Sequence, residues 1–147
     1  MPQSVIEVLV HIVFSTKNRN DLIPNNLEDE LYRYIHGIIE NNLAKLIIVG
    51  GTANHIHLLV SIGRNDIPKL IGDVKRSTSI WVKKKGAYGF YWQKGYGAFS
   101  IGQSQVADVL RYIRNQKEHH STLEYKTEFR ALCEKYQVEI DERYCWD

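Results

Sequence analysis

The 147-residue sequence contains only two cysteines, and no apolar stretch in it is long enough to cross a bilayer. Cys133 and Cys145 provide neither a disulfide framework nor a pair of thiols at zinc-site spacing. The first residues lack the charged start and apolar block of a signal peptide, because Glu7 and His11 interrupt their apolar run. We therefore expect a reduced, cytoplasmic protein with no membrane partner.

The chain also lacks internal repeats, low-complexity tracts and a dividing linker, and its formal net charge is only +2. Its length and ordinary composition predict one folded domain over residues 1–147. The charge is unevenly distributed, because basic residues gather between Lys69 and Lys85. A local basic surface indicates a phosphate-bearing partner, although a solvated helix face produces the same pattern.

The spacing of apolar residues predicts four strands and four helices. Strands are expected over residues 5–14, 46–49, 55–62 and 97–101, and helices over 27–41, 67–81, 104–119 and 123–136. Asp66 and Ser104 are the expected caps of the second and third helices, and Cys133 falls on an apolar stripe of the last one. The order predicts an α+β protein with a ferredoxin-like split βαβ sandwich, an antiparallel sheet with helices on one face, plus C-terminal helices.

Two histidines flank Ile56 in the third expected strand. Strand alternation places His55 and His57 on one face and Ile56 on the other. Two imidazoles placed in this way can bind one divalent cation, each through a ring nitrogen. The same pattern also suits a plain polar patch, so the pair by itself leaves both interpretations open.

A phenol and a side-chain amide lie one helical turn apart in the third expected helix. Tyr112 and Gln116 lie at the edge of the apolar stripe, so they offer a nucleophile and a third ligand on one face. A half-buried packing tyrosine is the alternative. The ordinary pKa of a phenol is about 10, so this nucleophile needs help, which a divalent cation beside the phosphate supplies.

Four motifs follow one another in an order that resembles a known family. They are His11-Ile12-Val13-Phe14-Ser15-Thr16-Lys17-Asn18-Arg19, His55-Ile56-His57-Leu58-Leu59-Val60, the stretch from Tyr91 to Ser100, and the stretch from Val109 to His120. Together they resemble the single-tyrosine transposases of the IS200 type, within the histidine-hydrophobic-histidine (HUH) endonucleases. The resemblance covers nearly the whole chain. Asn54 departs from the acidic residue that many members carry before the first histidine.

The resemblance implies a DNA transposase that cuts and rejoins single-stranded element ends with hairpins. Tyr112 would form a 5′-phosphotyrosine and release a free 3′ hydroxyl, and His55, His57 and Gln116 would hold Mg²⁺ or Mn²⁺. Zinc is disfavoured because no thiolate or third strand histidine accompanies the pair. The resemblance also implies a homodimer in which the tyrosine helix of one subunit completes the metal site of the other.

Rings and cations in the same motifs predict contacts with unpaired bases and phosphates. The residues expected to bind nucleic acid are Lys17, Arg19, Lys75, Arg76 and Trp92. About half of the aromatic residues between positions 81 and 96 are expected in the core instead.

Three alternatives stay open at this stage. A non-catalytic single-strand-binding module accounts for the rings and cations but gives no reason for the histidines, the tyrosine and the glutamine together. A domesticated relative would nick repeated palindromes without mobilising itself. A histidine phosphoesterase needs Ser or Thr two places after each histidine, whereas Leu59 follows His57 at that position.

His11 is expected to be a hydrogen-bonded packing residue, and the adjacent His119 and His120 diverge too far on a helix to share one ion.

Overall fold

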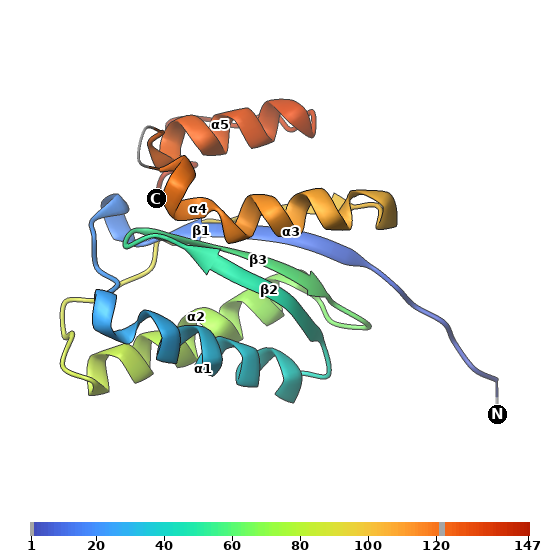
Figure 1. Ribbon diagram of the computed structural model, residues 1–147, viewed down its shortest axis with the longest axis horizontal. Coiled ribbons are helices and arrows are strands. Elements are labelled where there is room, and N and C mark those ends of the chain that lie inside the picture. Colours follow the sequence, from blue (N-terminus) through green and yellow to red (C-terminus); the bar gives the residue numbers. More distant parts are fainter. Residues whose placement is uncertain (1, 121–122) are drawn as a thin grey trace.

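The computed structural model describes residues 2–120 and 123–147, and its centre is a four-stranded antiparallel sheet (Figure 1). The strands are β1 (Leu9–Ser15), β2 (Lys45–Gly51), β3 (His55–Ser61) and β4 (Gly97–Ile101). The helices are α1 (Glu28–Asn41), α2 (Ile67–Lys84), α3 (Val106–Arg114), α4 (Gln116–His119) and α5 (Tyr125–Lys135). The spatial strand order β2-β3-β1-β4, with every pair antiparallel, is the predicted ferredoxin-like arrangement.

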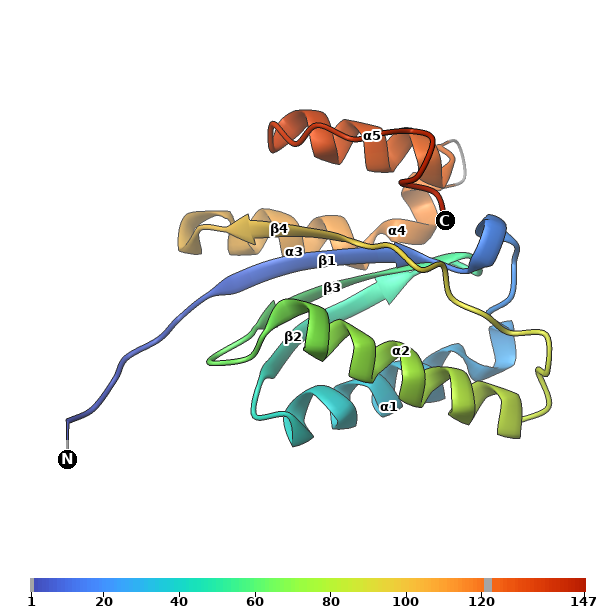
Figure 2. The ribbon, with the colours of Figure 1, turned by 180° about the vertical axis from the view of Figure 1, so that it is seen from behind.

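Strand alternation sorts the side chains of the central strands into two layers. Ile12 of β1, with Ile56 and Leu58 of β3, packs against α1 and α2. Leu9 and Leu59 point the other way and pack against α3. Figure 2 shows α1 and α2 on one side of the sheet and α3 and α5 on the other. The first two helices therefore lie on one face as predicted, and the C-terminal helices cover the opposite face.

Helix α2 begins and packs as its sequence predicts. The Asp66 carboxylate accepts a hydrogen bond from the backbone N–H of Lys69 at 3.1 Å, and Pro68 lies in the first turn. The apolar stripe includes Leu70 and Val74, which are buried against the sheet. This layer is a conventional hydrophobic core and carries none of the predicted histidines.

Two glycines let the C-terminal helices lie close to the sheet. A Cβ at Gly50 of β2 would lie 2.4 Å from the carbonyl oxygen of Ile113 in α3. A Cβ at Gly97 of β4 would lie 2.9 Å from the Phe129 ring in α5. A side chain at either position would push a helix away from the sheet, so these glycines set the depth at which α3 and α5 rest.

Several predicted boundaries are wrong, each for a local reason. Strand β1 starts at Leu9, not at Val5, because its partners in β3 and β4 end at Ser61 and Ile101 opposite Leu9. The last helix starts at Tyr125, not at residue 123. Residues 121–122, in the predicted connection before it, lie outside the described residues.

The predicted third helix is interrupted. It ends at Arg114, because Asn115 leaves helical geometry at φ −97° and ψ 21°, and α4 follows it. Ser104 does not cap it, because a short 3₁₀ turn (Gln103–Gln105) precedes α3. There the Gln105 side chain accepts a hydrogen bond from the Gly102 N–H at 2.9 Å.

The interpretation of Cys133 is confirmed. Cys133 is a buried core residue beside Phe129 and Leu132, and both cysteines are free thiols. None of the helices among the described residues is both long and apolar enough to span a membrane.

Candidate metal centre and nucleophile

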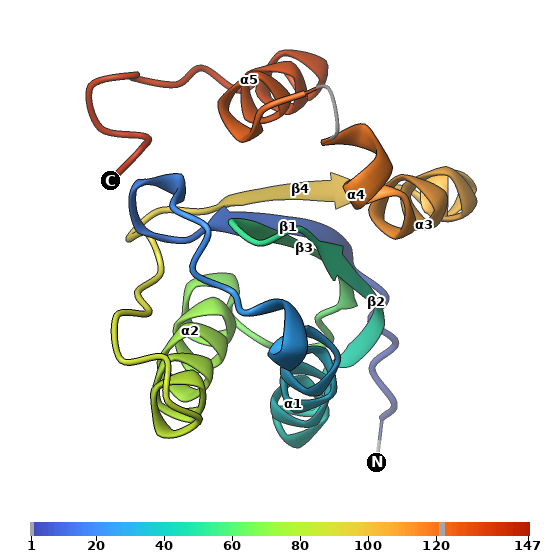
Figure 3. The same cartoon turned by 60° about the vertical axis from the view of Figure 1, so that its left-hand side comes forward.

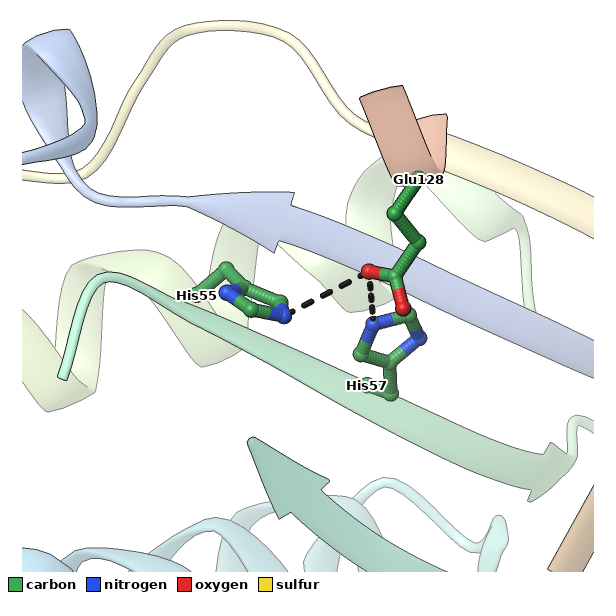
Figure 4. Close-up of side chains that lie close together, drawn as sticks. All are labelled: His55, His57 and Glu128. Carbon is green, nitrogen blue, oxygen red and sulfur yellow. Dashed lines mark hydrogen bonds and ion pairs between the residues drawn. The ribbon is translucent and has the colours of Figure 1, made fainter. Parts of the chain in front are cut away.

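His55 and His57 lie on the α5 side of the sheet, where their Nε2 atoms face the carboxylate of Glu128 (Figure 4). Glu128 Oε1 lies 2.8 Å from His57 Nε2 and 3.4 Å from His55 Nε2. One ligand atom from each of the three residues lies within 4.8 Å of the others, and all three side chains are buried. Two imidazole nitrogens and one carboxylate oxygen thus converge on one point.

In both histidines, the ring nitrogen that does not face Glu128 contacts another side chain. His55 Nδ1 lies 2.7 Å from Asn54 Oδ1 and 2.9 Å from Thr52 Oγ1. His57 Nδ1 lies 2.7 Å from Nε2 of His11, which is itself buried. Partners of this kind fix the ring orientation and tautomer of metal-binding histidines. Asn54 therefore holds the first imidazole through its amide oxygen, and His11 is hydrogen-bonded as predicted.

Tyr112 and Gln116 approach the same carboxylate from the other side. The Tyr112 hydroxyl donates a hydrogen bond to Glu128 Oε2, and Gln116 Nε2 donates to the same oxygen at 3.0 Å. Gln116 Oε1 lies 2.9 Å from His55 Nε2. Despite the interruption at Asn115, the predicted tyrosine and glutamine lie on one face, and the structure brings both to the predicted histidine pair.

The buried site keeps His11 and His57 neutral and the Glu128 carboxylate charged. Burial lowers the pKa of His57 to about 4 and that of His11 to about 3. Burial also acts to raise the pKa of Glu128, but its contacts with His120, His55 and His57 outweigh this and hold the pKa well below its usual range. Neutral imidazole and ionised carboxylate are the forms that bind metal ions. The buried group of His55, His57 and Glu128 therefore fits a divalent ion.

Glu128 is the site residue that sequence reasoning misses. Its position between Tyr125 and Phe129 places a charge within the apolar stripe of α5, which is buried in the structure. A charged residue at a core position of an amphipathic helix needs a partner, so this was the available signal.

The two adjacent histidines at the end of α4 diverge as expected. His119 is exposed, and its ring lies 5.0 Å from that of Tyr112. His120 faces inward, with Nε2 3.1 Å from Glu128 Oε2 and its ring 4.3 Å from that of His55. His120 is therefore the member of the pair that belongs to the site.

The residues predicted to bind nucleic acid do not all lie together: Lys17 and Trp92 line one groove, whereas Arg76 lies outside that lining. Lys75 and Arg76 belong to α2, on the sheet face opposite the histidines. The Lys75 ammonium donates to three backbone carbonyls, of Gln93, Lys94 and Gly95, at 2.8–3.1 Å.

Trp92 and Arg76 are also engaged within the protein, whereas Lys17 is exposed. Trp92 donates to the Thr78 hydroxyl at 2.9 Å and packs edge-on against Phe14. Arg76 pairs with Asp73 at 2.6 Å. Lys17 and Arg19 lie in the turn after β1, where the Arg19 carbonyl accepts a hydrogen bond from Asn54, the side-chain partner of His55.

Two cavities adjoin the centre. One of about 510 Å³ is lined by residues that include Thr52, Asn54 and His120. The other, of about 420 Å³, is lined by residues that include His11, Tyr112 and Glu128. The centre is therefore buried but flanked by space on both sides.

A ferredoxin-like sheet that carries a buried His-His-Glu group beside a tyrosine defines an α+β protein with a candidate metal centre on the sheet. The chain belongs to the family of IS200-like transposases, because the family model described as "Transposase IS200 like" matches residues 4–116. Membership assigns the chain a transposase role and hence the status of an enzyme. Glu128 lies beyond the matched segment.

Two solved structures share the fold. One is a proposed transposase from Deinococcus radiodurans R1, with 19% identity, 79% of this chain and 95% of that chain covered, and a TM-score of 0.63. The other is a REP-associated tyrosine transposase bound to a REP hairpin, with 12% identity, 84% and 74% covered, and a TM-score of 0.64. No curated protein matches the chain.

Proposed function

We propose that this transposase nicks and rejoins single-stranded DNA in a metal-dependent reaction, with Tyr112 as the nucleophile. The observation that carries the proposal is one shared carboxylate. Glu128 contacts His57 through Oε1 and accepts the Tyr112 hydrogen bond through Oε2. The nucleophile therefore lies beside the candidate metal centre within a single chain.

In the proposed step, the Tyr112 oxygen attacks the phosphorus of a phosphodiester, and the bond from phosphorus to the 3′ oxygen breaks. The tyrosine loses its phenolic proton, the released 3′ oxygen gains a proton, and the 5′ phosphate stays on Tyr112. The phosphotyrosine ester retains the energy of the broken bond. Attack by another 3′ hydroxyl would then rejoin strands without a nucleoside triphosphate.

His55, His57 and Glu128 would hold the ion, and Gln116 Oε1 would add the predicted amide ligand. When bound, Mg²⁺ or Mn²⁺ would favour the phenolate and withdraw charge from the phosphate oxygens. Without it, burial and then the charge of Glu128 raise the pKa of Tyr112 above its usual value, so the phenol keeps its proton. Mn²⁺ accepts imidazole more readily than Mg²⁺ does, and both accept carboxylate oxygen.

The proposed substrate is single-stranded DNA with hairpin ends. The neighbour bound to a REP hairpin supports this class of DNA. The same observation favours one second candidate, a domesticated relative that nicks repeated palindromes. A non-catalytic binding module gives no reason for five polar side chains to converge on the buried Glu128 carboxylate. The cytoplasmic location stays a prediction.

The shared-site homodimer also stays a prediction. The described chain brings Tyr112 to its own histidines, with the ring centroids of Tyr112 and His57 5.7 Å apart. Cleavage within one subunit thus needs no exchange of helices, and a mixing experiment distinguishes the two arrangements.

The direct test uses single-stranded, hairpin-forming oligonucleotides copied from the DNA that flanks the gene. The purified protein is incubated with each labelled strand and Mn²⁺, and the products are separated on a denaturing gel. A covalent adduct that peptide mass spectrometry locates on Tyr112 supports the proposal. An adduct on another residue, or metal-dependent cutting without an adduct, would refute the mechanism.

A further inference from the structure

We propose that a groove beside the metal centre binds one unpaired nucleotide of the DNA strand. The groove joins the turn after β1, the loop before β4 and the last described residues of the chain. It has a volume of about 350 Å³. Its lining includes Lys17, Asn18, Tyr91, Trp92, Lys94 and Trp146, and we call it the Tyr91 groove. The inference rests on the proposed single-stranded substrate.

The groove presents an exposed ring between two cations. The side chain of Tyr91 is 51% exposed. The Lys83 ammonium lies 3.9 Å from its ring centroid, and the Lys17 ammonium lies 5.7 Å away. Sites for unpaired nucleic acid combine a ring that stacks on a base with cations that neutralise the phosphates. Tyr91 with Lys17 and Lys83 supplies this combination.

A second ring of the groove lining, Trp146, also lies beside cations. The Trp146 ring has the guanidinium carbons of Arg130 and Arg19 at 5.3 and 6.0 Å and the Lys126 ammonium at 5.1 Å. Asp147 is the acidic residue in the groove lining, which also includes Lys17 and Lys94, and Glu142 pairs with Arg130 at 2.6 Å. The excess of cations fits a phosphodiester strand better than an acidic or neutral peptide.

The groove is preformed. Lys94 and Gly95 donate their backbone N–H groups to the carbonyl oxygen of Asp147, each at 2.9 Å, which fixes the last residues against the loop. The Lys75 ammonium holds the carbonyls of the same loop from beneath. Figure 3 shows the C-terminus close to the turn after β1. A preformed site loses little conformational entropy when a strand binds.

The turn that forms one wall is strained. Asn18 and Arg19 both have left-handed backbones, with φ of 57° and 55°. Two consecutive non-glycine residues in this region cost free energy, and such strain gathers at binding and catalytic sites. The turn is held in place by the Lys17 N–H, which donates to the Tyr91 carbonyl at 2.8 Å.

One side chain connects the groove to the metal centre. Asn54 Nδ2 donates to the Arg19 carbonyl at 3.2 Å, and Asn54 Oδ1 lies 2.7 Å from His55 Nδ1. The Thr16 N–H also donates to the Asn54 carbonyl at 2.8 Å. These contacts place the turn that borders the groove next to the residue that holds His55, so a strand bound at the histidines can place a neighbouring base in the groove.

The test measures binding of a fluorescent single-stranded oligothymidylate in excess chelator, so that no cutting occurs. Tyr91→Ala should weaken binding about tenfold, because a stacked base contributes about 1–3 kcal/mol. Tyr91→Phe keeps the ring and should bind like the wild type. Lys17→Ala should lower the salt dependence of binding by about 0.7 in the logarithmic slope, the share of one phosphate on a single strand.

The matched control is Tyr144→Ala. Tyr144 is 65% exposed and has the Arg143 guanidinium 5.3 Å from its ring, but it lies outside the groove lining. Tyr144→Ala should bind like the wild type. Wild-type affinity in Tyr91→Ala as well would overturn the inference. If the wild type forms the Tyr112 adduct while Tyr91→Ala binds normally, only the groove is wrong. If the strand binds as predicted but no adduct forms with Mn²⁺, the proposed function fails and the groove stands. A wild type that binds no single strand refutes both.

Discussion

The Tyr112 hydroxyl donates a hydrogen bond to Glu128, which lies on another helix sixteen positions further along the chain. The other oxygen of the same carboxylate lies 2.8 Å from His57 Nε2. One side chain of α5 therefore connects the proposed nucleophile with the proposed metal ligands. Substitution of Tyr112 should remove cutting, and substitution of the histidines or Glu128 should also remove metal binding.

Tyr112→Phe should bind hairpin DNA almost as well as the wild type but should form no covalent adduct, because only the nucleophilic oxygen is removed. The variant also loses one hydrogen bond to the charged Glu128 carboxylate, which lowers stability by about 1.5–3 kcal/mol. Adduct formation is read on a denaturing gel and binding by fluorescence anisotropy. A persistent covalent band in this variant would assign the nucleophile to another residue.

The loss of metal affinity should depend on which proposed ligand is substituted. His57→Ala should abolish Mn²⁺ binding and cutting, and Gln116→Ala should weaken them less, because water can replace one oxygen donor. Glu128→Gln keeps the side-chain volume but removes the charge, and should weaken Mn²⁺ binding strongly. Calorimetric titration measures the affinities.

The control for these variants is His36→Ala, which removes an exposed histidine that pairs with Glu40. It should leave Mn²⁺ affinity unchanged. A chelator should abolish DNA cutting by the wild type, and added Mg²⁺ or Mn²⁺ should restore cutting. Full cutting in excess chelator would contradict the metal dependence.

Lys75→Met should lower stability while leaving the salt dependence of DNA binding unchanged. The Lys75 ammonium donates to three carbonyls, and each hydrogen bond to a charged group contributes about 1.5–3 kcal/mol. Lys69→Met is the matched control, because Lys69 lies on the same helix and pairs with Asp73 at the surface. Thermal unfolding and salt titrations measure both effects. A flatter salt dependence in Lys75→Met alone would show that Lys75 contacts phosphate.

The metal-free protein should lose stability as the pH falls from about 7 toward 4. The pKa of His11 is lowered to about 3 and that of His57 to about 4, both below the ordinary value of 6.5. Below pH 6.5 the unfolded chain therefore binds protons that the folded chain excludes, so acid favours unfolding. Melting temperatures in chelator should show the decline. His11→Gln removes one of these groups and should flatten the curve, and an unchanged slope would count against the neutral buried pair.

Mixing two inactive proteins tests the shared-site homodimer. One carries Tyr112→Phe and the other His57→Ala, and tagged pull-down verifies that subunits exchange. If sites are shared, a mixed dimer contains one site with intact histidines and an intact tyrosine, and cutting returns. If exchange occurs without cutting, Tyr112 acts on the metal centre of its own chain, as the geometry of the described chain allows.

The local pattern of apolar and polar residues was enough to predict most of the fold. The order of strands and helices follows from hydrophobic periodicity, and the alternation around Ile56 places His55 and His57 on one face. The spacing of Tyr112 and Gln116 similarly places them one turn apart. The ends of the elements were less predictable, because β1 begins where its neighbours end and α3 stops at Asn115. Such limits depend on pairing partners and on backbone geometry that residue preferences bias only weakly.

The sequence by itself determined which residues share a face, because side-chain direction in a strand or helix repeats with a fixed period. Only the tertiary structure decided which faces meet. It brought Glu128 to the histidines, turned His120 rather than His119 inward, and placed the Lys75 ammonium against three carbonyls of the loop before β4. These contacts join residues far apart in the chain, or depend on the break at Asn115, so local periodicity does not encode them. They arise because α3 and α5 rest on one sheet face at a depth that Gly50 and Gly97 allow, and a carboxylate buried there needs partners.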